Sequence, residues 1–208
     1  MTVLTLSQAA ADTTGKCVIS QKTYEFEDTS DSTGASVSRL LGPPRWSMAL
    51  SAMDILTSAQ SPEWEMLMFR MRGTINRLAV WDVSRAVPRG TLALSGLTLV
   101  GAQALGDTTV VVGGAGAAQT VKMGDWLQIG TGIGTSQLVK VSADATATGG
   151  GQVTLSIEPP LRLAFSGGSA VVSNKPVAYY KKMGGATSYS TDGYNYTGHS
   201  LDLLEQWN

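Results

Sequence analysis

The chain has little of what most catalytic and metal-binding proteins require. Its 208 residues include one cysteine, Cys17, and one histidine, His199. A single cysteine excludes an internal disulfide framework, and one cysteine with one histidine cannot make a zinc cluster. Charged residues make up 15% of the chain, against roughly 25% in an average soluble protein. The composition therefore excludes an internal disulfide framework and a zinc cluster, and by itself it indicates no particular activity.

Neither sign of charge dominates, and no long hydrophobic run is present. Lysine and arginine total 15 and aspartate and glutamate 16, which gives a net charge of −1. This balance does not indicate general binding to nucleic acid or to an anionic membrane. No stretch approaches ~20 apolar residues, and the N-terminus lacks the basic start and apolar core of a signal peptide. We therefore expect folding in a cytoplasm and no membrane-spanning segment.

Glycine and a shift in composition indicate the architecture. Glycine accounts for 24 residues, well above the roughly 7% that is usual, which with the low charge favours strands and tight turns. Residues 89–175 hold only two of the 14 aromatic residues, Trp126 and Phe165. Because large side chains dominate core burial, the aromatic-rich flanks are expected to share one core. We predict a mainly-β fold, with a discontinuous β-sandwich domain (1–88 plus 176–208), one flanking α-helix and an inserted small β-barrel (89–175).

Local patterns place the expected elements. Residues 16–27 and 46–52 alternate as strands do, and residues 29–38 between them are predicted to be a polar loop that ends at Gly42-Pro43-Pro44. A helix is predicted from Ser61 as N-cap, with Pro62 in its first turn and an apolar face of Trp64, Leu67, Met68 and Met71. Further strands are expected at 76–83, 108–112, 126–129, 137–141, 152–157, 170–173 and 177–183. Residues 189–196 are predicted to be a loop or a hairpin, and the C-terminal tail a strand.

The candidates for chemistry are weak. His199 lies near Ser200 and Asp202, but a catalytic triad needs a base placed by folding rather than by adjacency. Cys17 is expected to be a small buried residue. The Gly113–Gly116 run lacks the lysine and helix of a phosphate loop. The aspartates 28, 31, 125 and 144 do not match a calcium loop and are expected in turns. We assign no catalytic, cofactor-binding or metal-binding residue and expect no cofactor.

Two other groups of residues have structural interpretations that we prefer. The densest basic stretch holds Arg70, Arg72, Arg77, Arg85 and Arg89, and its arginines are expected in solvent or in protein contacts rather than against a polyanion. Trp46, Trp64 and Trp81 are expected in the core rather than on a sugar-binding surface.

The order of these elements resembles a known family. RWSMALSA is followed by SPEWEMLMFRMRG, NRLAVWDV and SRAVPRGTL. The insert carries MGDWLQIG, QLVKVSADA, GQVTLSIEPPLR and GSAVVSNKPVAYY. This arrangement, over roughly residues 40–180, resembles the distal tail proteins of phages with long non-contractile tails (siphovirus-like bacteriophages). SLDLLE fits the last strand of such a protein.

The resemblance implies a structural virion protein without enzymatic activity. It implies a six-fold ring at the distal end of the tail tube, which joins the tube protein to tail-tip hub and fibre or receptor-binding proteins. The end of the tape-measure protein, and later the DNA, would only pass through its lumen. The expected location is the virion tail tip, after assembly in the bacterial cytoplasm. No interface residue is assigned, although residues 28–38 are expected to order against a neighbouring subunit or tube protein.

Two alternatives remain open. Other tail or neck ring components, such as tube, terminator or connector proteins, are also built from β-rich subunits. A carbohydrate-binding module would require exposed tryptophan or tyrosine beside hydrogen-bonding acids, and a glycan hydrolase would also need two carboxylates at a defined separation.

Overall fold

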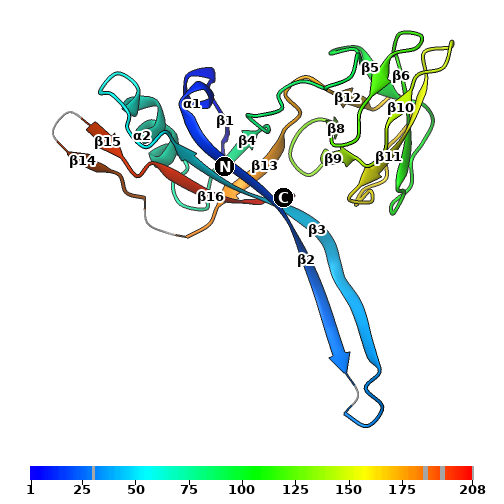
Figure 1. Cartoon of the computed structure of the whole chain (residues 1–208), viewed down its shortest axis with the longest axis horizontal. Helices are drawn as coiled ribbons and strands as arrows, with labels where there is room; N and C mark the ends of the chain where they lie inside the picture. Colours follow the sequence, from blue (N-terminus) through cyan, green and yellow to red (C-terminus); the bar gives the residue numbers. More distant parts are fainter. Residues whose placement is uncertain (30, 185–186, 193–194, 208) are drawn as a thin grey trace.

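The computed structural model describes residues 1–29, 31–184, 187–192 and 195–207. Their strands form one six-stranded sheet and one closed six-stranded barrel, beside two pairs of short strands. The mainly-β class and the inserted barrel predicted from the sequence are confirmed. In Figure 1 the sheet region lies on the left and the barrel on the right, and a long hairpin leaves the body between them.

The six-stranded sheet, here called the host sheet, combines the two flanks of the chain. Its strands lie in the order β1 (Val3–Thr5), β4 (Arg77–Val80), β13 (Ala178–Lys182), β16 (Ser200–Glu205), β3 (Ser36–Ala52) and β2 (Thr14–Thr29). β1 pairs with β4 in parallel, and all other neighbours are antiparallel. Because β13 and β16 follow the barrel in sequence, the chain leaves the sheet, forms the insert and returns to the same core.

Two short helices share this core where the sequence predicted one. The unpredicted helix is α1 (Gln8–Asp12). It begins after Ser7, whose Oγ accepts a hydrogen bond from the Ala10 N–H at 3.1 Å. At five residues it is too short to show a periodic apolar pattern, which explains why the sequence did not predict it. With the second helix and a small hairpin it forms the layer that packs against the host sheet.

The predicted helix is present as α2 (Ser61–Arg70). The expected apolar face is confirmed, since Trp64, Leu67, Met68 and Met71 are all buried. Its N-cap is Gln60, so the prediction of Ser61 at that position is wrong by one residue. The Ser61 hydroxyl instead donates to Glu65 one turn along the same helix and contacts the His199 ring, and it caps no backbone N–H.

The predicted polar loop at 29–38 is right at its centre and wrong at its ends. Residues 31–35 are an exposed connection between the strands of a long β2–β3 hairpin, whereas Thr29 ends β2, and β3 starts at Ser36 and continues through Gly42-Pro43-Pro44. Residue 30 lies outside the described residues. Proline cannot donate to a sheet ladder, and it is tolerated in strands mainly at edges and bulges. Here the register jumps from Lys22 opposite Arg45 to Tyr24 opposite Gly42, which leaves both prolines in a bulge. The chain therefore stays extended where the sequence suggested a stop.

The barrel has its own core. Its strands close in the order β11 (Val153–Glu158), β6 (Thr109–Gly113), β5 (Leu97–Leu99), β12 (Ala170–Val172), β8 (Trp126–Ile129) and β9 (Gln137–Val141). All lie within 89–175, and five correspond to the predicted strands. The sixth, β5, is three residues long and was not predicted. The barrel core is made of small branched side chains such as Val110, Val112 and Leu155.

The remaining strands form two small pairs. They are β7 (Thr120–Val121) with β10 (Ala145–Thr146), and β14 (Ser190–Asp192) with β15 (Asn195–Thr197). The second pair settles residues 189–196 as a hairpin, while residues 193 and 194 of that segment lie outside the described residues. The C-terminal tail forms β16, as predicted.

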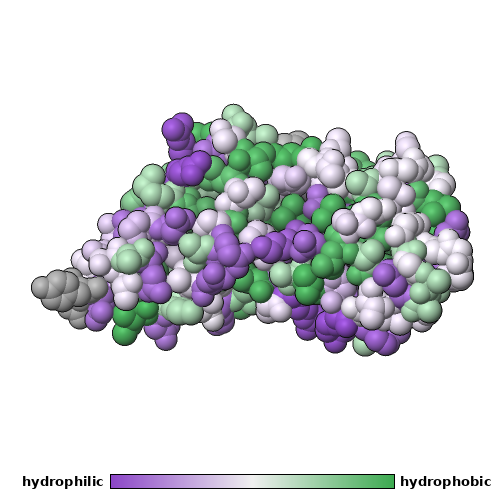
Figure 2. Space-filling model, turned by 90° about the horizontal axis from the view of Figure 1, so that it is seen from above, coloured by the Kyte–Doolittle hydropathy of each residue, from purple (hydrophilic) through white to green (hydrophobic). Residues whose placement is uncertain are grey.

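Hydrophobic and hydrophilic side chains are intermingled over the face seen from above, and the host region and barrel adjoin without a gap (Figure 2). In the described part of the chain, no helix has the length and apolar character needed to cross a bilayer.

Candidate functional surfaces

His199 does not form the triad that its neighbours in sequence suggested. Its side chain is 2% exposed, whereas Ser200 and Asp202 are exposed, as expected where alternate residues face opposite sides of a strand. The His199 Nε2 instead lies 3.1 Å from the Ser61 Oγ, and that hydroxyl donates to Glu65. Burial lowers the pKa of His199, although the nearby Glu65 carboxylate opposes the shift. A neutral His199 therefore ties the start of α2 to the strand β16.

Cys17 lies in a setting that suppresses thiol reactivity. Burial, with the negative charge of Asp82, raises the pKa of the thiol to about 11. A reactive cysteine requires the opposite shift, because the thiolate is the nucleophile. Cys17 lines a hollow of about 170 Å³ beside Trp46, Asp82 and Lys140. It packs at the edge of the host core, as expected for a small apolar residue.

Asp125, Asp144 and the glycine run serve turns, whereas Asp28 lies in the strand β2 opposite Val37, so the expectation of a turn is wrong for it. Asp125 accepts backbone hydrogen bonds from Lys122 at 2.8 Å and Arg89 at 3.0 Å, and Asp144 accepts one from Met123 at 2.7 Å. Over the described ranges, His, Cys, Asp and Glu side chains form no group of three that could hold a metal ion. Gly114 has a φ of +83°, and a Cβ there would lie 2.3 Å from the Gly96 carbonyl oxygen. The glycine run thus permits a tight turn with close backbone approach.

The predicted basic stretch divides into two places. Arg70, Arg72 and Arg77 lie at the end of α2 and the start of β4, whereas Arg85 and Arg89 reach the barrel. Arg85 donates to the Gly124 carbonyl at 3.3 Å, and Arg89 donates to the Met123 carbonyl. These two arginines therefore fasten the linker to the β7–β8 turn rather than forming one face with the other three.

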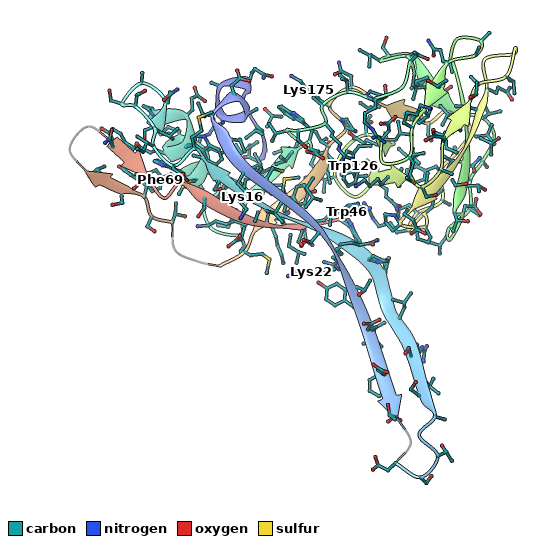
Figure 3. All side chains as sticks on the ribbon, in the orientation of Figure 1. Lys16, Lys22, Trp46, Phe69, Trp126 and Lys175 are labelled. Carbon is teal, nitrogen blue, oxygen red and sulfur yellow. The ribbon has the colours of Figure 1, made fainter. Side chains whose placement is uncertain are left out.

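The three tryptophans of the sequence analysis lie in the core, as predicted, and one of them forms the junction with the barrel. Trp46 and Trp126 meet edge to face, with ring centroids 4.9 Å apart. The Trp46 Nε1 donates to the Leu138 carbonyl at 2.9 Å, and the Trp126 Nε1 donates to Asp82 at 2.9 Å. Figure 3 shows the two rings between the host sheet and the barrel. Each region thus offers an aromatic ring and a hydrogen-bond acceptor to the other.

A buried ion pair crosses the same junction. Arg162 of the barrel lies 3.3 Å from Glu205 of β16, and their side chains are 7% and 4% exposed. Glu205 also accepts from the Trp46 backbone N–H at 3.0 Å. Burial raises the pKa of Glu205, opposed by the Arg162 charge, and burial lowers the pKa of Arg162 to about 10. The Trp207 ring lies under two guanidinium groups, 4.4 Å from Arg45 and 4.5 Å from Arg162.

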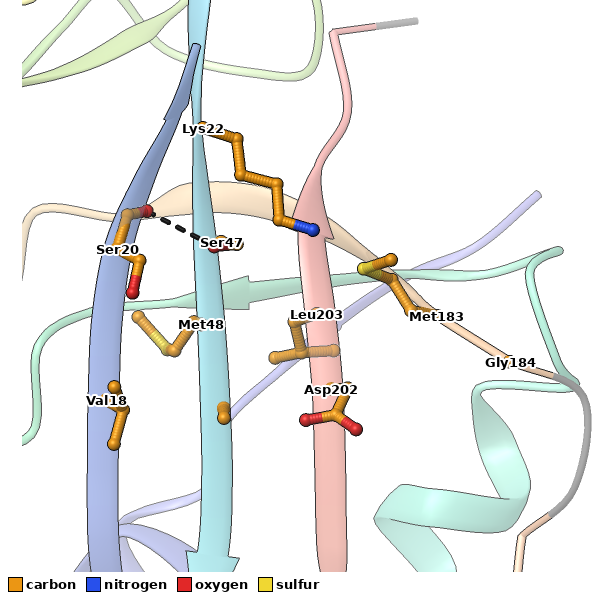
Figure 4. A pocket seen from close by; sticks show the side chains of 10 residues that line it. Val18, Ser20, Lys22, Ser47, Met48, Met183, Gly184, Asp202 and Leu203 are labelled. Carbon is orange, nitrogen blue, oxygen red and sulfur yellow. Dashed lines mark hydrogen bonds between the residues drawn. The ribbon is translucent and has the colours of Figure 1, made fainter.

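A shallow groove of about 380 Å³ crosses the outer face of β2, β3 and β16 (Figure 4). Most of the side chains that line the groove are small and uncharged, and Lys22 lies at one end and Met183 at the side. The Ser47 Oγ donates to the Ser20 carbonyl at 3.3 Å. The Ser47 hydroxyl is therefore held by a backbone carbonyl of the neighbouring strand.

The most unusual surface is the outer part of the β2–β3 hairpin, residues 22–45, here called the arm. β16 pairs with β3 only as far as Ser47, so beyond that point no third strand among the described residues extends the ladder of the hairpin. Every described residue in 20–41 is exposed. A two-stranded hairpin is at best marginally stable in water by itself. Where the arm meets the barrel, an apolar pocket of about 490 Å³ is lined by Leu40, Leu41, Pro43, Pro44 and Leu105 among others.

Sequence reasoning missed the arm and the ion pair for different reasons. The predicted strand at 16–27 already included Tyr24 and Phe26, but the opposite strand was predicted to start only at Trp46, because Gly42-Pro43-Pro44 normally ends a strand. The Arg162–Glu205 contact joins positions 43 residues apart in two different regions, and no local pattern indicates it.

Comparisons with models of known protein families and with curated proteins find no match to this chain.

Proposed function

We propose that this chain is a structural subunit of a bacteriophage tail, which forms a ring at the distal end of the tail tube. The ring joins the tube to the tail-tip hub and fibre proteins and surrounds the DNA channel. The subunit performs no catalysis. It acts at the virion tail tip after assembly in the host cytoplasm, and its resemblance to distal tail proteins motivates this assignment.

The observation that carries the proposal is the arm. The arm exposes Phe26, Val37, Leu40 and Leu41 at 55%, 68%, 60% and 68%. A hairpin that projects from the body with apolar side chains on display is a typical site of association rather than a feature of an isolated monomer. In a permanent ring, a neighbouring subunit would bury these exposed apolar side chains of the arm.

The junction supports the same role. The tryptophan pair and the buried Arg162–Glu205 pair hold the barrel against the host sheet. A barrel held in this way keeps one orientation in every subunit, so a ring can present several copies in register to a partner. The tryptophans that a glycan-binding surface would use, Trp46, Trp64 and Trp81, are at most 7% exposed.

The proposal is tested by native mass spectrometry of the purified chain at micromolar concentration, with negative-stain images of the same sample. We expect a closed ring with a central channel and a mass six times 21.7 kDa. A chain that stays monomeric at every accessible concentration contradicts the proposal.

A further inference from the structure

The two faces of the arm differ in chemistry. Successive strand residues alternate between faces, and residues opposite each other in a ladder share one. Tyr24, Phe26 and Asp28 therefore lie on one face, with their ladder partners Arg39 and Val37. Glu25 and Glu27 lie on the other face together with Leu40, which is paired with Glu25. The first face carries both signs of charge, whereas the second combines two acids with an exposed apolar side chain.

The outer part of the arm is net negative. Residues 23–41 contain four carboxylates, at Glu25, Glu27, Asp28 and Asp31, and one cation, Arg39, which lies opposite Phe26 on the face away from Glu25 and Glu27. Four acids and one base give this segment a net charge of −3. The partner of the arm is expected to offer positive charge together with apolar side chains.

The chain itself carries such a surface on the outer side of α2 and the turn that follows. This α2 patch consists of Met66, Phe69, Arg70, Arg72 and Ile75. Its apolar members are 55%, 49% and 60% exposed, and both arginines are exposed. Residues 66–77 hold three arginines and no acid. Within the described ranges no carboxylate forms an ion pair with Arg70 or Arg72.

The patch and the arm lie at opposite ends of the host region. Figure 3 labels Phe69 at the far end from the hairpin, which starts near Lys22 and points away from α2. The arm of one molecule is therefore directed away from its own patch. Two complementary surfaces at opposite ends of one subunit fit a second copy of the same chain.

We infer that the arm of one copy lies on the α2 patch of the next copy in the ring, an inference that rests on the proposed ring function. The face in contact is the one that carries Glu25, Glu27 and Leu40. Its two acids lie opposite Arg70 and Arg72, and Leu40 covers the apolar members of the patch. Such a contact is heterologous, because it joins two different surfaces, and repetition of it by rotation closes a ring.

Charge reversal tests the contact. The arm variant carries Glu25→Lys and Glu27→Lys, and the patch variant carries Arg70→Glu and Arg72→Glu. Each variant places like charges together, so we expect the concentration for half-assembly to rise by about a hundredfold or more. An equimolar mixture of the two variants restores opposite charges at every contact and should assemble as an even-membered ring. The chain with all four substitutions should also assemble.

Matched variants control for folding and for charge. Arg70→Lys with Arg72→Lys keeps both charges and should retain the ring. All the substituted side chains are exposed, so the thermal midpoint of each monomer should equal that of the wild type.

The outcomes separate this inference from the proposed function. Loss of assembly in each variant with recovery in the mixture supports the contact. Rings that persist in both charge-reversed variants overturn it and leave the ring function standing, with the arm assigned to another protein of the tail. Loss of assembly in both charge-reversed variants, with no ring formed by their mixture, also overturns the proposed contact between arm and patch. A wild-type chain that never assembles overturns both proposals.

Discussion

Replacing Arg162 should destabilise the junction between the host sheet and the barrel and lower the free energy of unfolding. In Arg162→Met the side chain keeps most of its length, and the Glu205 carboxylate loses the cation 3.3 Å away while staying 4% exposed. Breaking a buried pair by removing one partner costs about 3–5 kcal/mol, because an uncompensated charge is left behind. Total stability is typically about 5–15 kcal/mol. The variant should therefore lose a large part of its resistance to denaturant.

The loss should depend on pH. Burial raises the pKa of Glu205, so the folded chain holds this proton more tightly than the unfolded chain, whose value is near 4.5. The stability that a raised pKa contributes is present below the unfolded value and is lost as pH rises through the folded value. Removal of Arg162 raises the pKa of Glu205 further. Arg162→Met should thus be less destabilised near pH 5 than near pH 8.

The assay is urea denaturation at both pH values, followed by tryptophan fluorescence because Trp46 and Trp126 lie at the junction. Glu205→Leu leaves a permanent cation, so its loss should be nearly the same at both pH values. The variant with both Arg162→Met and Glu205→Leu should lose less free energy of unfolding than either single variant, because it leaves no unpaired buried charge. Lys122→Met, which breaks an exposed pair with Asp144, should change stability very little. If Arg162→Met loses no more than Lys122→Met at pH 8, the reasoning about the buried pair is refuted.

Two further predictions concern single residues. Gly114→Ala places a Cβ 2.3 Å from the Gly96 oxygen at a φ of +83°, so thermal denaturation should show a loss of about 1–3 kcal/mol. Gly149→Ala, where a Cβ would meet no atom within 4 Å, should change stability very little. Equal losses of stability in the two variants would contradict the close approach of Gly114 to Gly96. The pKa of about 11 at Cys17 predicts alkylation at pH 8 that is about a hundredfold slower in the native chain than in urea. Equal rates would show an unprotected thiol.

The elements that the sequence predicted well are those whose pattern is local. The apolar face of α2 repeats at helical spacing, β6 is a β-branched run that ends in glycine, and β11 alternates buried and exposed residues. The burial of Trp46, Trp64 and Trp81 followed from side-chain size alone. In each case the residues that indicate the element lie within a single helix or a single strand.

The features that were missed depend on contacts between distant segments. Ser61 has the chemistry of an N-cap, but His199, 138 residues away, takes up its hydroxyl. Pro43 and Pro44 normally end a strand, and only the bulge opposite β2 lets β3 continue through them. The partners of Arg162 and of the arm are set by tertiary arrangement, which no local pattern contains.

The central claim is a ring held by the arm, and the most direct measurement compares the native mass of the full chain with that of a chain whose arm is shortened. Residues 23–44 are replaced by an Asn-Gly turn between Lys22 and Arg45, which already face each other across the ladder. We predict a six-subunit ring for the full chain and a folded monomer for the shortened one. A shortened chain that forms the same ring, or a full chain that remains a monomer, would contradict the account.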